Sequence, residues 1–245
     1  MSHATPCDAC PLRAREGFKP LGGAELDFIE TLRSRELQRD AGETLLREGQ
    51  TTGELYTLRA GWAFRYRSLP DGRRQILNFL LPGDFIGLQA EMAGKLPHGV
   101  EALTPLRLCA FPRDGLWEVY RRFPGLGYDL TWLSAHEELI VDENLVSVGR
   151  RSALERIAML LVHLYKRARS VGEEGEDGAI VFPLNQQHIA DALGLSLVHT
   201  NRSLRRLQAL GLHQIAAGRL RLLRVDALQR LAEYHALPLH SRPLI

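Results

Sequence analysis

The chain has 245 residues, of which 45% are hydrophobic and 24% charged, and its formal net charge is +2. This composition is typical of a globular protein of one or two domains and excludes a polycation. The longest apolar runs, such as Ile76–Pro82, are too short to span a membrane, and the N-terminus has no apolar stretch of the signal-peptide type. We therefore expect a cytoplasmic protein with no membrane partner.

The first 20 residues carry Cys7 and Cys10 in a segment with little apolar content, which we expect to stay mobile without a ligand. Three cysteines in the whole chain are too few for a disulfide scaffold. Ala24–Leu37 is expected to form a helix whose leucines and isoleucine face the core.

From Leu37 to Pro112 the pattern changes to short apolar or alternating runs separated by turn signals such as Ala60-Gly61 and Pro70-Asp71-Gly72. Many short strands at this spacing predict a β-barrel or β-roll. The expected strands are Leu55–Leu58, Trp62–Arg67, Gln75–Leu81, Val100–Leu103 and Leu106–Phe111.

Pro124 can start a long helix that runs to Val148 and has a length of about 35 Å. One of its sides approximates a heptad pattern, which is typical of a dimer interface; the alternative is a long core helix packed on the barrel. The expected interface residues are Leu126, Leu130, Leu133, Glu137, Ile140, Val141, Asn144, Leu145 and Val148.

The remaining chain predicts a winged helix-turn-helix. Ser152 and Glu155 form a capping box for a helix over Ala153–Ser170, an acidic, glycine-rich loop follows, and Ile180–Leu184 is a short strand. Next come a helix at Gln187–Leu193, Gly194 as its C-terminal residue and Ser196 as the cap of a second helix. The hairpin Leu212–Ile215 with Leu220–Val225, which forms the wing, and the helix Ala227–His235 complete the pattern.

The second helix combines a stripe of apolar residues, Leu197, Thr200, Leu204, Leu207 and Leu210, with an arginine-rich outer face. Six arginines and no carboxylate lie between residues 202 and 224, which is a local positive patch. Such a helix suits insertion into the DNA major groove; the alternative is an ordinary helical hairpin with a solvated charged face. The expected DNA contacts are Ser196, Val198, His199, Asn201, Arg202, Arg205 and Arg206.

The pattern as a whole predicts an α+β protein with a cupin-like β-roll sensor domain, a long dimerisation helix and a C-terminal winged helix-turn-helix. The expected segments are a cysteine-bearing tail over 1–20, the sensor domain over 21–123, the helix over 124–149 and the DNA-binding domain over 150–245. Since neither a Ser/His/Asp arrangement nor a phosphate-binding loop is present, we do not expect an enzyme.

This order of elements resembles the Crp/Fnr family of bacterial transcription regulators. The resemblance covers roughly residues 21–236, and its specific motifs are Leu80–Gly87, Arg151–Ile157 and Ile189–Arg202. It implies a homodimer that binds a palindromic site in double-stranded DNA, with RNA polymerase as a further partner if the protein is an activator. In the cyclic-nucleotide members an Arg-Ser pair holds the phosphate, whereas the matching stretch Gly87–Val100 has no arginine. We therefore do not expect cAMP binding.

The Fnr branch of the family implies an iron–sulfur cluster. Cys7 and Cys10 match its N-terminal cysteine pair, and Cys109 matches its cysteine on a late barrel strand, but the further cysteine usual after the pair is missing. Three cysteines suit a 3Fe-4S cluster, or a 4Fe-4S cluster whose last iron takes an oxygen or nitrogen ligand from Glu16, Asp8 or His3.

The resemblance thus implies a regulator that senses O₂, nitric oxide or redox state. The alternatives are a thiol or disulfide switch, a zinc site, and a regulator that binds a small molecule or haem in the β-roll. An alternative from another class is an electron-transfer protein whose helix-turn-helix is only structural.

Overall fold

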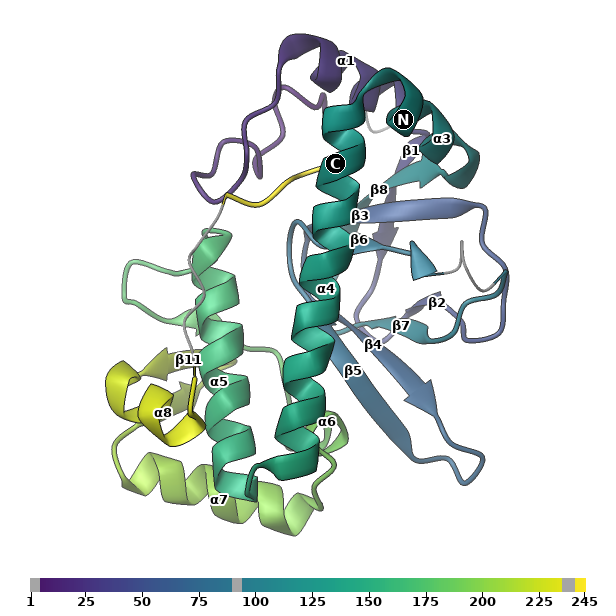
Figure 1. The fold of residues 1–245 in the computed structure, drawn as a ribbon. Helices are drawn as coiled ribbons and strands as arrows, with labels where there is room; N and C mark the ends of the chain where they lie inside the picture. The colour runs from purple at the N-terminus through teal and green to yellow at the C-terminus, as the bar shows by residue number, and fades with distance from the viewer. Residues whose placement is uncertain (1–4, 90–93, 235–240) are drawn as a thin grey trace. The chain divides into compact units, whose positions relative to one another are not determined.

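The computed structural model describes residues 5–89, 94–234 and 241–245. The chain divides into two compact units (Figure 1). Unit 1 comprises residues 1–67, 79–139 and 240–245, and unit 2 comprises residues 68–78 and 140–239. The division falls inside one long helix, whereas the sequence predicts boundaries on either side of that helix. Residues 241–245 follow the DNA-binding elements in the chain but belong to unit 1.

The strands between Arg35 and Pro112, labelled β1 to β8 in chain order (Figure 1), form two antiparallel sheets. The strand orders are β1-β8-β3-β6 and β2-β7-β4-β5. Leu46 and Val100 from one sheet and Leu58, Ile86 and Leu108 from the other share a single core, which confirms the predicted β-roll. The strands are β1 (Arg35–Arg39), β2 (Thr44–Leu46), β3 (Glu54–Ala60), β4 (Ala63–Ser68), β5 (Arg74–Leu80), β6 (Phe85–Ile86), β7 (Gly99–Ala102) and β8 (Leu106–Pro112).

The helix expected at Ala24–Leu37 is wrong at its C-terminal end. Helix α1 (Gly23–Leu32) ends at Arg33, whose backbone is extended, and Arg35 already begins β1. Leu37 pairs with Leu108 across the β1–β8 ladder and is buried, while its neighbour Gln38 is exposed. Pairing with β8 therefore outweighs the local helical pattern of this stretch.

A second core cluster in unit 1 lies where helices meet the sheet that contains β8. It includes Phe28 and Ile29 of α1 and Val119 of α3 (Leu116–Arg122), which follows the short 3₁₀ turn η1 (Arg113–Gly115). Leu126, Leu130 and Leu133 of α4 (Pro124–Arg150) also belong to it. Cys7, Cys109 and Ile245 complete the cluster, so three segments far apart in sequence meet at one place.

Unit 2 contains the predicted winged helix-turn-helix. Its elements are α5 (Ala153–Ser170), β9 (Ile180–Val181), α6 (Gln186–Leu193), α7 (Leu197–Ala209), β10 (His213–Ala216), β11 (Arg219–Leu222) and α8 (Val225–Ala232). The wing strands pair with β9 in the order β10-β11-β9. Both ends of the turn motif match the prediction: Gly194 has φ +61° after α6, and the Ser196 hydroxyl accepts a hydrogen bond from the His199 amide.

The capping box at the start of α5 is also formed. The Glu155 amide donates to Ser152 Oγ, and the Ser152 amide donates to Glu155 Oε2 at 2.8 Å. In the part of the chain that the structure describes, every helix is too short or too polar to cross a membrane.

The first prediction concerns the turn between β3 and β4. Gly61 has φ +92°, and a Cβ atom there would lie 2.3 Å from the carbonyl oxygen of Pro105. Gly42 has a similar φ of +82° with open space around the Cβ position, so it is a matched control. We expect Gly42→Ala to lower the free energy of unfolding by about 1–3 kcal/mol through backbone strain alone. Gly61→Ala should lower it clearly more, because the Pro105 backbone must also move. Urea unfolding followed by tryptophan fluorescence measures the free energy of unfolding of both variants. Equal decreases would contradict the close contact between Gly61 and the Pro105 carbonyl.

Candidate DNA-binding surface and cysteine site

Helix α7 has one buried and one exposed side. Thr200, Ser203 and Leu207 are buried, which leaves the opposite side of the helix open. Leu197 and Leu210 are exposed, and Leu204 is half-buried, so the apolar stripe expected from the sequence is narrower than predicted. Helix α7 packs against α5, and the small residues Thr200 and Ser203 are part of its buried side.

The predicted DNA-contacting residues lie on the open side of α7. Asn201 is half-buried, and the other six are exposed. They are Ser196, Val198, His199, Arg202, Arg205 and Arg206. Ser196 uses its hydroxyl oxygen as the helix cap, so only its O–H remains to donate to a phosphate. The arrangement fits a recognition helix, and the contacts themselves stay a prediction.

The positive patch is divided by a carboxylate that the sequence analysis missed. Asp177, in the loop before β9, pairs with Arg219 at 2.8 Å and with Arg221 at 2.9 Å. None of the ion pairs among the described residues involves Arg202, Arg205 or Arg206. The uncompensated positive charge is therefore concentrated on α7, and the wing arginines are partly neutralised.

The N-terminal segment is folded into a series of tight turns against unit 1. The amide of Cys10 donates to the carbonyl of Cys7 at 3.4 Å, and the amide of Arg13 donates to the carbonyl of Cys10 at 3.0 Å. Leu12 and Phe18 are almost completely buried and anchor these turns. Residues 5–18 thus pack against the rest of unit 1, and their mobility without a ligand stays a prediction.

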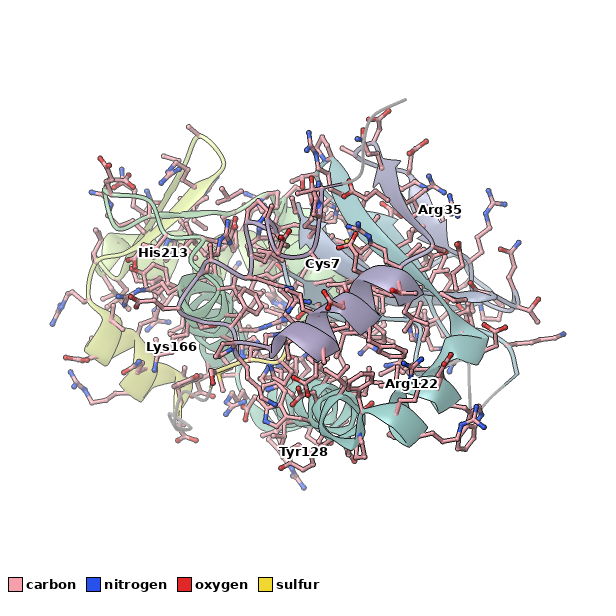
Figure 2. The ribbon with its side chains drawn as sticks, turned by 90° about the horizontal axis from the view of Figure 1, so that it is seen from above. Cys7, Arg35, Arg122, Tyr128, Lys166 and His213 are labelled. Carbon is pink, nitrogen blue, oxygen red and sulfur yellow. The ribbon has the colours of Figure 1, made fainter. Side chains whose placement is uncertain are left out.

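Three cysteines from two distant segments line one cavity of unit 1. Cys7 and Cys109 are buried and Cys10 is half-buried, and all three thiols are free. Cys109 lies on β8, where its ladder partners are Glu36 on β1 and Thr57 on β3. Figure 2 shows Cys7 beside α1. The other side chains at the cavity include Arg13, Ile29, Arg33, Arg59, Leu244 and Ile245.

An ionic network holds the two buried cysteines in place. The amide of Cys7 donates to Glu30, and the thiol of Cys7 contacts the same carboxylate. Arg33 pairs with Glu30 and contacts the thiol of Cys109. Arg33 also donates to the carbonyl of Thr5 at 2.6 Å, and Glu36 joins Arg59 at 2.6 Å. The two segments that carry the cysteines are thereby tied to the same charged residues.

Burial keeps the two inner thiols protonated. Burial, together with the hydrogen bond to Glu30, raises the pKa of Cys7 to about 12. Burial also raises the pKa of Cys109, although the nearby Arg33 guanidinium opposes that shift. Burial lowers the pKa of Arg13, while the three cysteines around it favour its charged form. Protonated thiols are weak nucleophiles, so Cys7 and Cys109 are poorly suited to thiol exchange as they stand.

Two of the three candidates for a non-cysteine ligand are not brought to the cavity. Asp8 and Glu16 are exposed and do not line it, and His3 lies outside the described residues. Over residues 5–89, 94–234 and 241–245 the structure contains no group of three or more His, Cys, Asp or Glu side chains arranged to hold a metal ion. Glu30 accepts a hydrogen bond from the amide of Cys7. Its i,i+3 spacing from Arg33 predicts their ion pair, but nothing in the sequence predicts the contact with Cys7.

The predicted dimer interface on α4 needs correction. Leu126, Leu130 and Leu133 are buried in the core of their own chain, as the core-helix alternative predicts. Ile140 is also buried, Glu137 pairs with Arg65 at 2.6 Å, and Asn144 donates to the carbonyl of Leu77 at 2.8 Å. Val148 is half-buried.

Only two of the predicted interface residues, Val141 and Leu145, are exposed. Other apolar side chains on the open side of α4 were not predicted. Tyr128 is 69% exposed and points away from the helix (Figure 2), and Leu139 and Val146 are about half exposed. The heptad-like pattern therefore identified the side of α4 that its own chain buries. The exposed apolar residues lie on other sides of the helix.

Comparison with known families matches both parts of the chain. Residues 36–123 match the cyclic nucleotide-binding domain, and residues 155–231 match the Crp-like helix-turn-helix domain. The first match describes the β-roll, and the second describes the helices and wing of unit 2.

Curated relatives align over most of the chain. The nitrogen fixation regulation protein FixK of Bradyrhizobium diazoefficiens is 32% identical over 91% of this chain and 93% of its own. The transcriptional activator protein FnrL of Cereibacter sphaeroides is 29% identical over 82% of this chain and 81% of its own. Both relatives are regulators and not enzymes.

Solved structures agree with this assignment. The structure of FixK2 from Bradyrhizobium japonicum superposes with a TM-score of 0.73 at 26% identity, and it covers 82% of this chain and 98% of its own. The β-roll, the helix-turn-helix and the full-length similarity to FixK lead to one conclusion: this chain belongs to the Crp/Fnr family of DNA-binding transcription regulators.

Proposed function

We propose that this regulator is a homodimer that recognises a palindromic DNA site through α7 and senses O₂, nitric oxide or redox state through an iron–sulfur cluster. Cys7, Cys10 and Cys109 would hold the cluster. The observation that carries the proposal is that the only three cysteines of the chain, from segments about 100 residues apart, line one cavity. Relatives named as anaerobic regulatory proteins support the same class of signal.

The charges around the cavity fit an anionic, sulfur-rich group. Arg13 has a buried Nη1 atom with no hydrogen-bond partner among the described residues, and the three cysteines surround this guanidinium. A buried guanidinium nitrogen without a hydrogen-bond partner is costly, and thiolates and cluster sulfides would supply acceptors for it. When bound, such a cluster supplies electron transfer and sensitivity to oxidants.

The chain's own residues would orient and tune the thiolate ligands. Glu30 and Arg33 hold the Cys7 and Cys109 side chains through direct contacts, in the manner of partners that orient metal ligands. Because both thiols are protonated in the metal-free chain, binding of iron must release their protons, and cluster assembly should be favoured at higher pH. Neither Asp8 nor Glu16 lines the cavity, which favours three protein ligands in the state described here.

The thiol-switch alternative is less well supported by this geometry. Cys7 and Cys109 are buried and have raised pKa values, whereas a redox-switch cysteine needs an accessible thiolate. The alternative of a small molecule or haem in the β-roll has no comparable support, because Leu46, Leu58 and Leu108 are buried in the core that the two sheets share.

A second copy of the chain is the natural occupant of the open side of α4. Leu139, Val141, Leu145 and Val146 are exposed apolar residues within two turns of this helix. Helix-turn-helix regulators read paired half-sites as dimers, and a long helix with exposed apolar residues suits a two-fold interface. Several relatives are named as transcriptional activators, which supports RNA polymerase as a further partner.

The second prediction separates base contacts from phosphate contacts on α7. Arg202→Ala should relax sequence specificity, because a bidentate arginine–guanine contact is worth about 1–3 kcal/mol. Arg206→Ala should weaken binding to all sequences alike and lower its salt dependence. Fluorescence anisotropy with specific and random duplexes measures both, with Arg230→Ala on α8 as a control for loss of one positive charge. Equal losses on both duplexes for Arg202→Ala would refute its assignment to a base.

The third prediction concerns the dimer. Leu145 is 71% exposed in one chain, so Leu145→Asp should leave the fold intact and raise the dimer dissociation constant at least about tenfold, because the interface would bury a charge. Leu133→Asp should instead unfold unit 1, because Leu133 lies in its core. Sedimentation velocity and urea unfolding distinguish the two variants, with Leu210→Asp as an exposed control. An unchanged dimer for Leu145→Asp would place the interface elsewhere.

The fourth prediction tests the cluster. Protein purified without oxygen should contain iron and sulfide and absorb in the visible range, and Cys109→Ala should abolish both. The same variant should lose any response of DNA binding to O₂. Ser34→Ala, a small change at an exposed residue that contacts the neighbouring Ala110 carbonyl, should retain the iron. Full iron and sulfide content in Cys109→Ala would exclude this ligand set, and DNA binding that ignores all three cysteines would favour a ligand in the β-roll.

A further inference from the structure

Residues 241–245, which we call the strap, pack against the N-terminal segment of unit 1. Arg242 forms a parallel bridge with Phe18: the amide of Lys19 donates to the carbonyl of Arg242, and the amide of Arg242 donates to the carbonyl of Gly17, both at 2.8 Å. The same N-terminal segment carries Cys7 and Cys10. The two segments are therefore joined through their backbones, directly beside the cysteine turns.

A buried ion pair anchors the strap on the β-roll. Arg242 lies 2.5 Å from Asp84, and its Nε donates to the carbonyl of Gly83 at 3.3 Å. Asp84 is almost completely buried and also accepts a hydrogen bond from the amide of Leu81 at 2.7 Å. A buried carboxylate needs a cationic partner, so this contact favours one position of the strap.

The strap ends at the cysteine cavity. Leu244 and Ile245 are buried and line the cavity together with Cys7, Cys10 and Cys109. The hydroxyl of Thr57 donates to the carbonyl of Ile245 at 2.6 Å, and Thr57 is the ladder partner of Cys109 on β3. One wall of the cysteine site is thus built by residues that follow the DNA-binding elements in the chain.

We infer that the strap is a removable cover of the cysteine site, which limits the access of water and oxidants to the buried thiols. Removing it would replace two apolar side chains at the cavity, Leu244 and Ile245, with solvent and would break the hydrogen bond between Thr57 and the Ile245 carbonyl. By linkage, an occupant of the cavity that displaces Leu244 or Ile245 would release the strap, and release of the strap would expose the site.

The cover can be tested on the metal-free, full-length chain by alkylation of Cys109 with iodoacetamide. Cys109 lies between Arg107 and Arg113, so trypsin releases it in a peptide without another cysteine, and mass spectrometry gives its rate. Leu244→Asp should raise this rate about tenfold or more, the factor that corresponds to losing the burial of one leucine side chain. Ser241→Asp adds the same charge at an exposed position of the strap and should leave the rate unchanged.

Hydrogen exchange distinguishes release of the strap from unfolding. The Lys19 and Arg242 amides should exchange faster in Leu244→Asp, while the Leu58 amide, which bonds to the carbonyl of Asp84 inside the roll, should stay protected. If the Leu58 amide also exchanges faster in Leu244→Asp, the same two measurements are made on Arg242→Gln. This second variant weakens the ion pair with Asp84 without changing a residue that lines the cavity. One outcome would overturn the inference: in the variant that keeps the Leu58 amide protected, the Lys19 amide exchanges faster but the alkylation rate of Cys109 is unchanged.

The consequence for sensing rests on the proposed iron–sulfur cluster and has its own readout. If the cluster is present, its visible absorbance should decay faster in air in Leu244→Asp than in Ser241→Asp. Absence of iron from the wild-type protein would refute the proposed cluster while leaving the alkylation result to decide on the cover.

Discussion

The position of Arg33 between two carboxylates is the interaction on which the cysteine site depends. Its side chain is only 6% exposed, pairs with Glu30 and Glu36, and donates to the Thr5 carbonyl. Because a buried guanidinium must keep its partners, Arg33 fixes the end of α1, the start of β1 and the N-terminal segment relative to one another. Cys7 and Cys109 are held through these same groups.

The sequence predicts those parts of the fold in which local signals and tertiary packing agree. The turn at Gly61, the capping box at Ser152 and the αL residue Gly194 have the expected roles. The heptad-like pattern of α4 was misread because periodicity shows that one side of a helix is buried, but not whether its own chain or a partner covers it. Likewise, Leu12 and Phe18 are too few to predict docking, which depends on a surface formed elsewhere in the chain.

For the candidate site, the sequence identifies the cysteines but not their surroundings. The resemblance to the Fnr branch pairs Cys7 and Cys10 with Cys109, and the structure places all three at one cavity. Arg13, Glu30 and the strap could not be predicted, because ionic partners and a covering segment from residues 241–245 leave no local pattern. Asp8 and Glu16 lie near the cysteine pair in the sequence, yet both side chains are exposed.

The distribution of charge in unit 2 bears on how DNA is read. The pairs between Asp177 and the wing residues Arg219 and Arg221 are exposed, so they are weak and screened by salt. A DNA phosphate, which carries a full charge and releases counterions when bound, can therefore replace Asp177 as the partner of the wing. Arg202, Arg205 and Arg206 need no such exchange, because none of the described ion pairs involves them. In the proposed mode of DNA binding, α7 would therefore make direct contacts, and the wing would add phosphate contacts only after Arg219 and Arg221 give up Asp177.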